Sequence, residues 1–282
     1  LMRHADQAMY QAKQIGKNRF SVFDATLDAE TTARHQHREQ IHNALSLGQF
    51  VLHYQPKVNL RDGKVVGVEA LVRWQHPEVG LLPPHDFLPS IHDHPLGMEL
   101  GEWVLNQALC QIGEWRRSGL LIPVSVNISA QQLLHGNFND MLSALLNRHP
   151  DIPHDQLELE ILEKSTHQDA RQVSEIMYQC LASGVEFSID DFGSGNSSLS
   201  ELKQLPARTL KIDQRLVSGM LDNADDLSIV SSIIGLATTF RRNVVAEGVE
   251  TERHGARLLE LGCSLAQGFC ISAPMPATDL PA

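Results

Sequence analysis

Short alternating runs of hydrophobic residues recur from Phe50 to the end of the chain. Because successive side chains of a strand point to opposite faces, these runs predict strands. The predicted strands cover residues 50–55, 64–73, 123–128, 157–161, 186–190, 208–212, 243–247 and 263–267. Helical periodicity fills most gaps, as in 97–117 and 168–183. Strands that alternate with helices predict an α/β fold.

The first two predicted strands differ from the others, because only "NLRDGK" separates them. This segment is too short for a crossover helix, so the two strands should form an antiparallel hairpin. Eight strands, with helical crossovers between the rest, predict a closed (β/α)8 barrel of the TIM type with one antiparallel strand. We assign the reversed direction to the strand at 64–73.

The N-terminal residues follow a different pattern. Residues 1–23 predict one helix and one short strand, which are too small to bury a core. Residues 24–48 are polar and predict a helical linker, and the barrel is expected to occupy 49–282. Because the chain starts at Leu1 within a helical pattern, we interpret it as part of a longer protein.

The 282 residues carry a formal net charge of −11 at pH 7. A nucleic-acid polymer is therefore not an expected partner, because following its backbone requires clustered Lys and Arg. The four cysteines show no CxxC spacing, and no apolar stretch reaches membrane-spanning length. These features predict reduced thiols and a cytoplasmic location, while missing N-terminal regions could anchor the full-length protein to a membrane.

A polar residue stands at the end of nearly every predicted strand. In "LELEIL", for example, Glu158 and Glu160 lie opposite the apolar face. If the apolar faces meet the helices, the polar faces line the barrel lumen, and the strand ends bring their side chains to one rim. The residues expected to converge there are Glu69, Asn127, Glu160, Asp190, Asp191, Lys211, Glu247 and Gln267.

Five of these residues are carboxylates, which repel one another and are costly to desolvate. Cations are needed to neutralise them, so the adjacent Asp190 and Asp191 are expected metal ligands. Each of these residues has a plainer explanation when it is considered alone. A Glu at the end of a strand is usually a charge at the rim, and a lone Lys is usually a solvated charge. An Asp-Asp pair before Gly usually forms a turn or a helix cap. Their shared position on successive strands favours the metal site. The sequence offers no partner for Glu158.

Oxygen ligands and one amide, without His or Cys, favour Mg²⁺ or Mn²⁺ over Zn²⁺. The histidines of the chain lie elsewhere. The "HDH" at 92–94 lacks a fourth ligand, so we do not expect a metal there.

The same stretches resemble the EAL family of cyclic di-GMP phosphodiesterases. "VEALVRWQHPEVG" contains the naming triplet, and "YQP", "SVNIS", "LELEILE", "DDFGSG", "LKID", "AEGVE" and "AQGF" stand in the family's order. This resemblance covers about residues 40–282. Residues 1–23 resemble the end of a GGDEF diguanylate cyclase domain through "ADQAMYQAK", without its signature motif or nucleotide pocket.

The resemblance implies metal-dependent hydrolysis of cyclic di-GMP to linear pGpG in bacterial signalling. It implies two Mg²⁺ or Mn²⁺ ions and inhibition by Ca²⁺, with the metal ligands Glu69, Asn127, Glu160, Asp190, Asp191 and Glu247. The implied catalytic residues are Lys211, which orients or activates the attacking water, Glu247 and Glu69. The implied substrate contacts are Gln55, Arg73, Glu250 and Gln267, and Glu163 is implied to brace the loop after "DDFG". Near the cations, Lys211 is expected to have a lowered pKa.

The resemblance also implies a homodimer and upstream GGDEF and sensory domains in the full-length protein. The chain departs from the family pattern at Leu162, Ser194, Asn196 and Ala273. Asn196 replaces an aromatic or apolar residue, which bears on activity and regulation. Two alternatives stay open: a receptor that binds cyclic di-GMP without cleaving it, and an unrelated barrel enzyme that acts on sugar phosphates.

Overall fold

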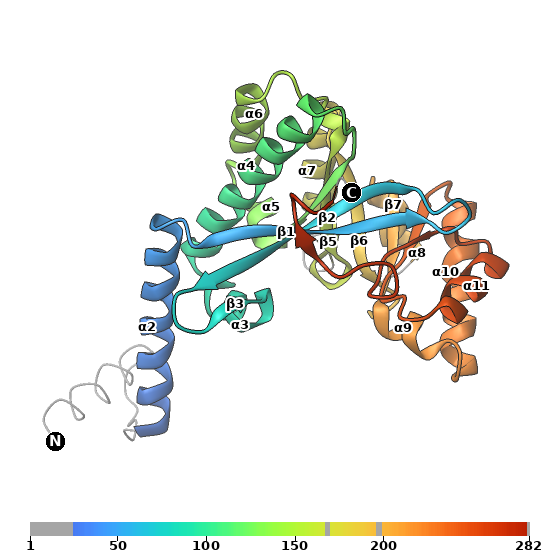
Figure 1. Ribbon diagram of the computed structural model, residues 1–282, viewed down its shortest axis with the longest axis horizontal. Coiled ribbons are helices and arrows are strands. Elements are labelled where there is room, and N and C mark those ends of the chain that lie inside the picture. The colour runs from blue at the N-terminus through green and yellow to red at the C-terminus, as the bar shows by residue number, and fades with distance from the viewer. Residues whose placement is uncertain (1–24, 167–169, 196–198, 281–282) are drawn as a thin grey trace, which may run out of the picture.

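The computed structural model describes residues 25–166, 170–195 and 199–280. The helix and strand predicted within 1–23 lie outside these residues, and so does Asn196. The first described helix, α2 (Ala25–Ser46), lies in the predicted linker and projects from one end of the molecule (Figure 1). Its C-terminal part packs on α3 and α4 through the buried Ile41 and Ala44, so the linker is joined to the barrel domain.

The first two strands form the predicted antiparallel hairpin. Residues of β1 (Phe50–Asn59) pair with β2 (Val65–His76). In the turn, the amide of Asn59 donates to the carbonyl of Lys64 at 2.8 Å, and Gly63 adopts a φ of 71° that glycine tolerates. Short strands extend the hairpin at its edges, β3 (Gly80–Leu82) on β2 and β10 (Met275–Pro276) on β1.

Eight strands close a barrel, as predicted. After the hairpin they are β4 (Val124–Ile128), β5 (Leu157–Leu162), β6 (Glu186–Phe192), β7 (Thr209–Ile212), β8 (Asn243–Ala246) and β9 (Leu265–Ala266). They follow β2 around the ring in chain order, and β9 meets β1 to close it.

The reversed strand is β1, so our assignment of the reversed direction to the strand that carries Glu69 is wrong. β2 runs parallel to β4, whereas β1 is antiparallel to both β2 and β9. A hairpin inverts one of its two strands, and the hydrophobic pattern does not say which. The long connection through α4 determines which strand is reversed. It returns the chain to the end of the sheet at which β2 began, so β4 runs parallel to β2.

Helices cover the outside of the barrel, with α4 and α6 on one side of the strands in Figure 1 and α9, α10 and α11 on the other. The helices are α3 (Pro84–Ile91), α4 (Pro95–Arg117), α5 (Ala130–Leu134), α6 (Phe138–Arg148), α7 (Ala170–Ala182), α8 (Leu199–Gln204), α9 (Gln214–Gly219), α10 (Ala224–Thr239) and α11 (Glu252–Leu261), with the 3-10 turns η1 (His154–Gln156) and η2 (Glu163–Thr166). The side chain of His94, in "HDH", caps α4 by accepting from the amide of Leu96. Among the described helices, none has the length and apolarity that crossing a membrane requires.

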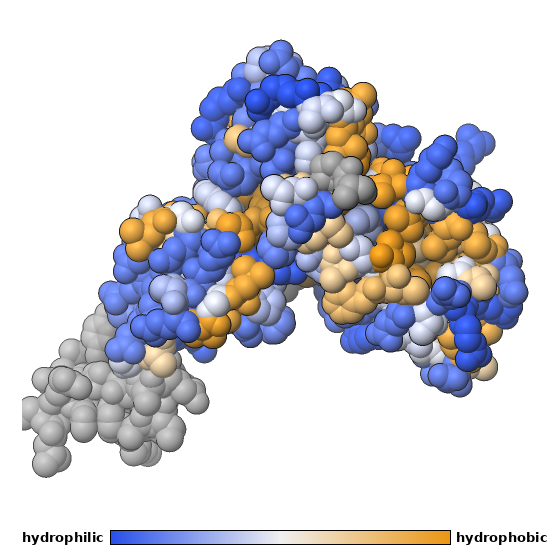
Figure 2. Space-filling view, viewed as in Figure 1, coloured by the Kyte–Doolittle hydropathy of each residue, from blue (hydrophilic) through white to orange (hydrophobic). Residues whose placement is uncertain are grey.

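The barrel strands separate apolar and polar side chains as the alternation predicts. Leu159 and Ile161 of β5 are fully buried and belong to the hydrophobic core shared with the helices, whereas Glu160 belongs to the polar lumen. Cys180 and Cys263 are free thiols in buried positions. On the face in Figure 2, hydrophilic residues cover most of the outer helices, with hydrophobic patches between them. The barrel lumen differs from both the surface and the hydrophobic core, because its charged side chains are buried.

Candidate active site

Neighbouring strands hold the predicted polar residues close to one another in the barrel lumen. Asn127 on β4 is level with Glu160 on β5, and Gln55 on β1 is level with Glu69 on β2. Direct contacts join seven of the eight residues predicted to converge, and we call them the Lys211 group: Glu69, Asn127, Glu160, Asp190, Lys211, Glu247 and Gln267. The eighth, Asp191, lies beside Asp190 and is described below.

The ammonium of Lys211 is the centre of this group. Its Nζ lies 2.6 Å from Glu247 Oε1 and 3.2 Å from both Glu69 Oε2 and Asp190 Oδ1. It also pairs with Glu160 Oε2. The side chain is 0% exposed, so solvent does little to screen these charges. Four carboxylates around one ammonium leave an excess of negative charge.

Two amides fix the carboxylate of Glu69. Asn127 Nδ2 donates to Glu69 Oε1 at 2.6 Å, and Gln267 Nε2 donates to Glu69 Oε2 at 2.8 Å. Gln267 Nε2 also donates to Gln55 Oε1 at 2.9 Å. Within the described residues, Gln267 Oε1 is buried without a hydrogen-bond partner, so it is an acceptor that a ligand can use.

A bulge in β6 brings both aspartates to the site. In a regular strand, Asp190 and Asp191 would point to opposite faces. The pairing of β6 with β7 shifts between Ile189 and Phe192, and Asp191 adopts a φ of 53°, a left-handed conformation that is uncommon outside glycine. As a result, carboxylate oxygens of Asp190, Asp191 and Glu247 lie within 4.8 Å of one another, close enough to share one cation.

Burial and mutual repulsion raise the pKa values of three carboxyl groups of the Lys211 group. Burial, reinforced by the charge of Glu160, raises the pKa of Glu69 and of Asp190, although Lys211 opposes the shift. Burial and the charges of Asp190 and Glu69 raise the pKa of Glu247 well above its ordinary value, again against Lys211. The site therefore disfavours the full negative charge that its sequence supplies, which is the condition a bound cation relieves.

The carboxylates around Lys211 raise its pKa. Burial disfavours its ammonium, but the surrounding carboxylates, chiefly Asp190 and Glu160, outweigh burial and raise the pKa well above its ordinary value. The expected lowering concerns Lys211 beside bound cations, and it stays a prediction.

Sequence reasoning missed a second buried lysine, Lys57 on β1. Its Nζ donates to Glu158 Oε2 at 2.9 Å and to Glu160 Oε1 at 3.0 Å, which supplies the missing partner of Glu158. Burial opposes ionisation of Glu160, but Lys211 and Lys57 outweigh it and lower its pKa to about 2. One signal could have found Lys57: it is two residues from Gln55 and therefore on the same face of the strand.

Glu163 lies where a brace for the loop after "DDFG" is expected. It follows β5 directly, is buried, and its Oε2 accepts from the amides of Gly193 and Gly195, both at 3.1 Å. A side chain at Gly195 would meet the Glu163 carboxylate at 3.1 Å, and Gly193 has a φ of 94°. Both glycines thus allow the loop to approach Glu163 closely.

Two predicted substrate contacts lie apart from the Lys211 group. Arg73 is half-buried, four residues beyond Glu69 on β2, and its Nη1 donates to the carbonyl of Val72 at 2.9 Å. Burial lowers the pKa of Arg73, although the charge of Glu69 opposes the shift. Glu250 is exposed in the loop between β8 and α11. Across the described ranges, neither residue makes a hydrogen bond or ion pair to the group.

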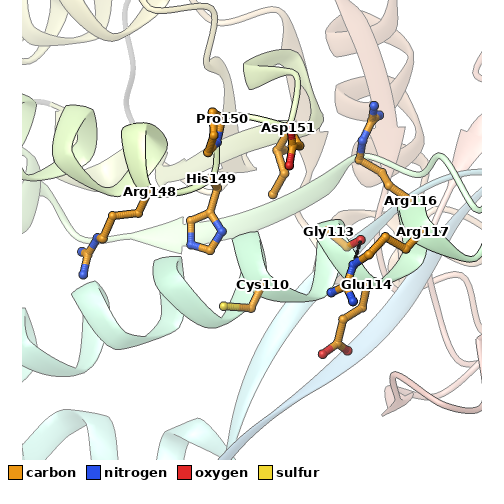
Figure 3. A pocket seen from close by; sticks show the side chains of 10 residues that line it. Cys110, Gly113, Glu114, Arg116, Arg117, Arg148, His149, Pro150 and Asp151 are labelled. Carbon is orange, nitrogen blue, oxygen red and sulfur yellow. Dashed lines mark hydrogen bonds between the residues drawn. The ribbon is translucent and has the colours of Figure 1, made fainter.

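A second charged hollow, the α4–α6 pocket, lies outside the barrel and has a volume of about 570 Å³ (Figure 3). Its lining residues are Cys110, Gly113, Glu114, Arg116, Arg117, Arg148, His149, Pro150, Asp151 and Ile152. Arg116 Nη1 donates to Gln156 Oε1 at 3.1 Å, and Arg148 Nη2 lies 3.8 Å from Glu102 Oε1. In Figure 3 the side chains of Arg116 and Arg148 extend to opposite sides. None of the predicted site residues lines this pocket.

Comparisons with known proteins identify relatives of the whole chain. The profile of the EAL domain family matches residues 38–274. The chain is 43% identical over 281 residues to the bifunctional diguanylate cyclase/cyclic di-GMP phosphodiesterase MucR of Pseudomonas aeruginosa, covering 99% of this chain and 41% of that protein. It is 35% identical over 277 residues to the cyclic di-GMP phosphodiesterase PdeR of Escherichia coli, covering 98% and 42%. The chain thus spans about two fifths of the length of these relatives.

A solved structure of the PaMucR phosphodiesterase in complex with c-di-GMP is similar to this chain. The TM-score is 0.84 at 43% sequence identity, and the match covers 87% of this chain and 99% of that one. This similarity confirms the predicted barrel with one antiparallel strand.

Proposed function

The chain belongs to the EAL domain family, and we propose that it is a metal-dependent phosphodiesterase that hydrolyses cyclic di-GMP to linear pGpG. The observation that carries this proposal is the Lys211 group, in which one buried ammonium meets four carboxylates in the barrel lumen. The complex of PaMucR with c-di-GMP supports the choice of substrate.

The residues of the lumen fit hard divalent cations. Its carboxyl groups outnumber its two buried lysines by six to two, an acidic excess that divalent cations can offset: Glu69, Glu158, Glu160, Asp190, Asp191 and Glu247 against Lys57 and Lys211. Oxygen ligands without His or Cys suit Mg²⁺ or Mn²⁺. The residues that would hold the ions are Glu69, Asn127, Glu160, Asp190, Asp191 and Glu247.

Bound cations would offset the charge of the phosphodiester, polarise its phosphorus and lower the pKa of a bound water. The ammonium of Lys211, held among four carboxylates, would orient or activate the attacking water. Glu247, 2.6 Å from Lys211 Nζ, would act beside it as an acceptor.

The substrate would be held by side chains around the Lys211 group. The fork of Arg73 can bind a phosphate through two hydrogen bonds, and the buried acceptor Gln267 Oε1 can take a hydrogen bond from the nucleotide. Gln55, which contacts Gln267, and Glu250 complete the proposed contacts. Glu163 would hold the loop that carries the aspartates.

The longer protein is proposed to carry upstream GGDEF and sensory domains and to form a homodimer. The first of these proposals is supported by MucR, which is named as a bifunctional cyclase and phosphodiesterase and is more than twice as long as this chain. Sedimentation of the purified protein with and without cyclic di-GMP tests the second; a monomer under both conditions would contradict it.

Product analysis tests the proposed activity. The purified chain is incubated with cyclic di-GMP and Mg²⁺ or Mn²⁺, and the nucleotides are separated by chromatography. We expect linear pGpG to accumulate only when a divalent ion is present. Tight binding without pGpG would indicate the receptor, and failure to bind cyclic di-GMP would contradict the proposed substrate.

A further inference from the structure

The buried Lys57 contacts residues that lie deeper in the barrel than Glu160 of the Lys211 group. Because β1 runs against its neighbours, Lys57 lies deeper than residues that precede it in β1, and it stands opposite Gly67 on β2. On β4 and β5 it contacts Ser125 and Glu158, which are level with each other. Asn127 and Glu160 lie two residues further toward the rim on the same two strands.

All three donors of the Lys57 ammonium have an acceptor. Nζ donates to Glu158 Oε2 at 2.9 Å, to Glu160 Oε1 at 3.0 Å and to Ser125 Oγ, which in turn donates to Glu158. Lys57 is 5% exposed and Glu160 is 1% exposed, so these contacts are shielded from solvent. The arrangement is a complete network rather than a single ion pair.

This network gives Glu160 a single orientation. Lys57 binds its Oε1 and Lys211 binds its Oε2, so an ammonium holds each oxygen of the carboxylate. The two ammonium groups come from different strands, and only Lys211 also contacts the other acids of the group. Lys57 therefore acts on Glu160 from the deep side of the barrel, opposite the oxygen that faces Lys211 and the other acids of the group.

Mutation of a residue that hydrogen-bonds a metal ligand from behind typically lowers metal affinity or activity about 10- to 100-fold. We propose that Lys57 is a positioning residue, which fixes the carboxylate of Glu160 for cation binding. The inference rests on the proposed function, since it takes Glu160 as a metal ligand. The plain alternative is that Lys57 only neutralises Glu158 inside the barrel and has no effect on the cation.

A charge-matched double variant separates the two roles. Lys57→Met with Glu158→Gln removes one positive and one negative charge, so the net charge of the lumen stays the same while Glu160 loses its deep partner. The matched control is Lys64→Met with Asp62→Asn, the same exchange at the exposed pair in the β1–β2 turn, where Nζ lies 3.7 Å from Asp62 Oδ2. The intact chain is titrated with Mn²⁺ alone, and free Mn²⁺ is measured by electron paramagnetic resonance.

We expect the Kd for Mn²⁺ to rise about 10- to 100-fold in the Lys57/Glu158 variant and to stay unchanged in the Lys64/Asp62 control. At saturating Mn²⁺, turnover of cyclic di-GMP should recover, with KM for the nucleotide unchanged. If circular dichroism shows that the Met variant is unfolded, Lys57→Gln with Glu158→Gln retains the stem and should still weaken binding about tenfold. If a folded variant has the same Kd as the wild type, the positioning role of Lys57 is overturned, while the proposed metal site and activity stand. Absence of Mn²⁺ binding by the wild type overturns the metal site, and with it both proposals.

Discussion

The barrel lumen and the α4–α6 pocket are both charged, and they differ in how their charges are paired. In the lumen, buried Lys211 contacts four carboxylates, of which Glu160 alone is also bound by Lys57, and burial raises the pKa of Glu69, Asp190 and Glu247. Around the pocket, Arg116 donates to Gln156, and Arg148 forms an exposed pair with Glu102. The buried excess of charge in the lumen therefore indicates a functional site more strongly than the 570 Å³ volume of the α4–α6 pocket does.

The difference shows how to recognise a site that requires a cation. Exposed charges are solvated and contribute little, whereas uncompensated buried charges are costly and persist only where something else offsets them. The chain has kept its acids in the lumen even though they raise one another's pKa values. We therefore expect changes in the lumen to affect turnover strongly and changes at the pocket to affect it little.

The largest effect is expected for Glu69→Ala. Glu69 contacts Lys211, Asn127 and Gln267, and we propose that it is a metal ligand. Losing about 4 kcal/mol of transition-state stabilisation would lower turnover about a thousandfold. The fold should remain, because the change removes one charge from an acidic excess and Lys211 keeps three other partners. Turnover is measured by pGpG formation and folding by thermal melting; undiminished cleavage would contradict the ligand assignment.

Replacing Mg²⁺ by Ca²⁺ should lower turnover at least about tenfold, because Ca²⁺ prefers more ligands at longer distances than a compact site supplies. The assay is initial rates of pGpG formation in metal-depleted buffer to which one ion is added back. Robust turnover with Ca²⁺ alone would argue against a compact oxygen site in the lumen.

A smaller effect is expected for Glu163→Ala, at the edge of the lumen. Two amides of the loop after the aspartates, those of Gly193 and Gly195, lose their acceptor. The free energy of unfolding should fall by about 1–3 kcal/mol, since buried donors are left unsatisfied. Glu163→Gln is the matched control, because its amide oxygen can still accept. Urea denaturation measures both variants, and equal stability of Ala and wild type would rule out the brace.

The smallest effect is expected for Arg148→Ala in the α4–α6 pocket. The Arg148–Glu102 pair is exposed, so the free energy of unfolding should change by no more than about 0.5 kcal/mol. Turnover of cyclic di-GMP should stay the same within error. A marked loss of turnover with normal stability would show that the pocket takes part in the reaction, and the contrast between the two regions would fail.

The alternation of apolar and polar residues was sufficient to predict the barrel and the convergence of its strand-end acids. The strand direction was not predictable in the same way, because the hydrophobic pattern of a strand is the same when it is read in either direction. Lys57 was missed because the predicted strand ended at residue 55, whereas β1 continues to Asn59. The depth of Lys57 in the lumen follows from the direction of β1. The α4 connection, rather than the strand itself, settles that direction.

Local backbone geometry also limited what could be predicted about the site from the sequence. The alternation places Asp190 and Asp191 on opposite faces, and only the bulge and the positive φ of Asp191 bring them together. The pKa of Lys211 depends on four partners from four strands, so no short motif reports it. The features that the sequence left undetermined are thus tertiary properties. They are the direction of β1, the depth of Lys57 in the lumen and the sum of the charges around Lys211.

The most direct test of the central claim, that the acids of the lumen gather around divalent cations, is anomalous diffraction from crystals of the chain grown with Mn²⁺. We predict anomalous peaks in contact with the carboxylates of Glu69, Asp190 and Glu247, and their loss when Asp190 is replaced by Asn. Peaks confined to the outer surface, or a lumen that stays free of Mn²⁺ in the wild type, would contradict it.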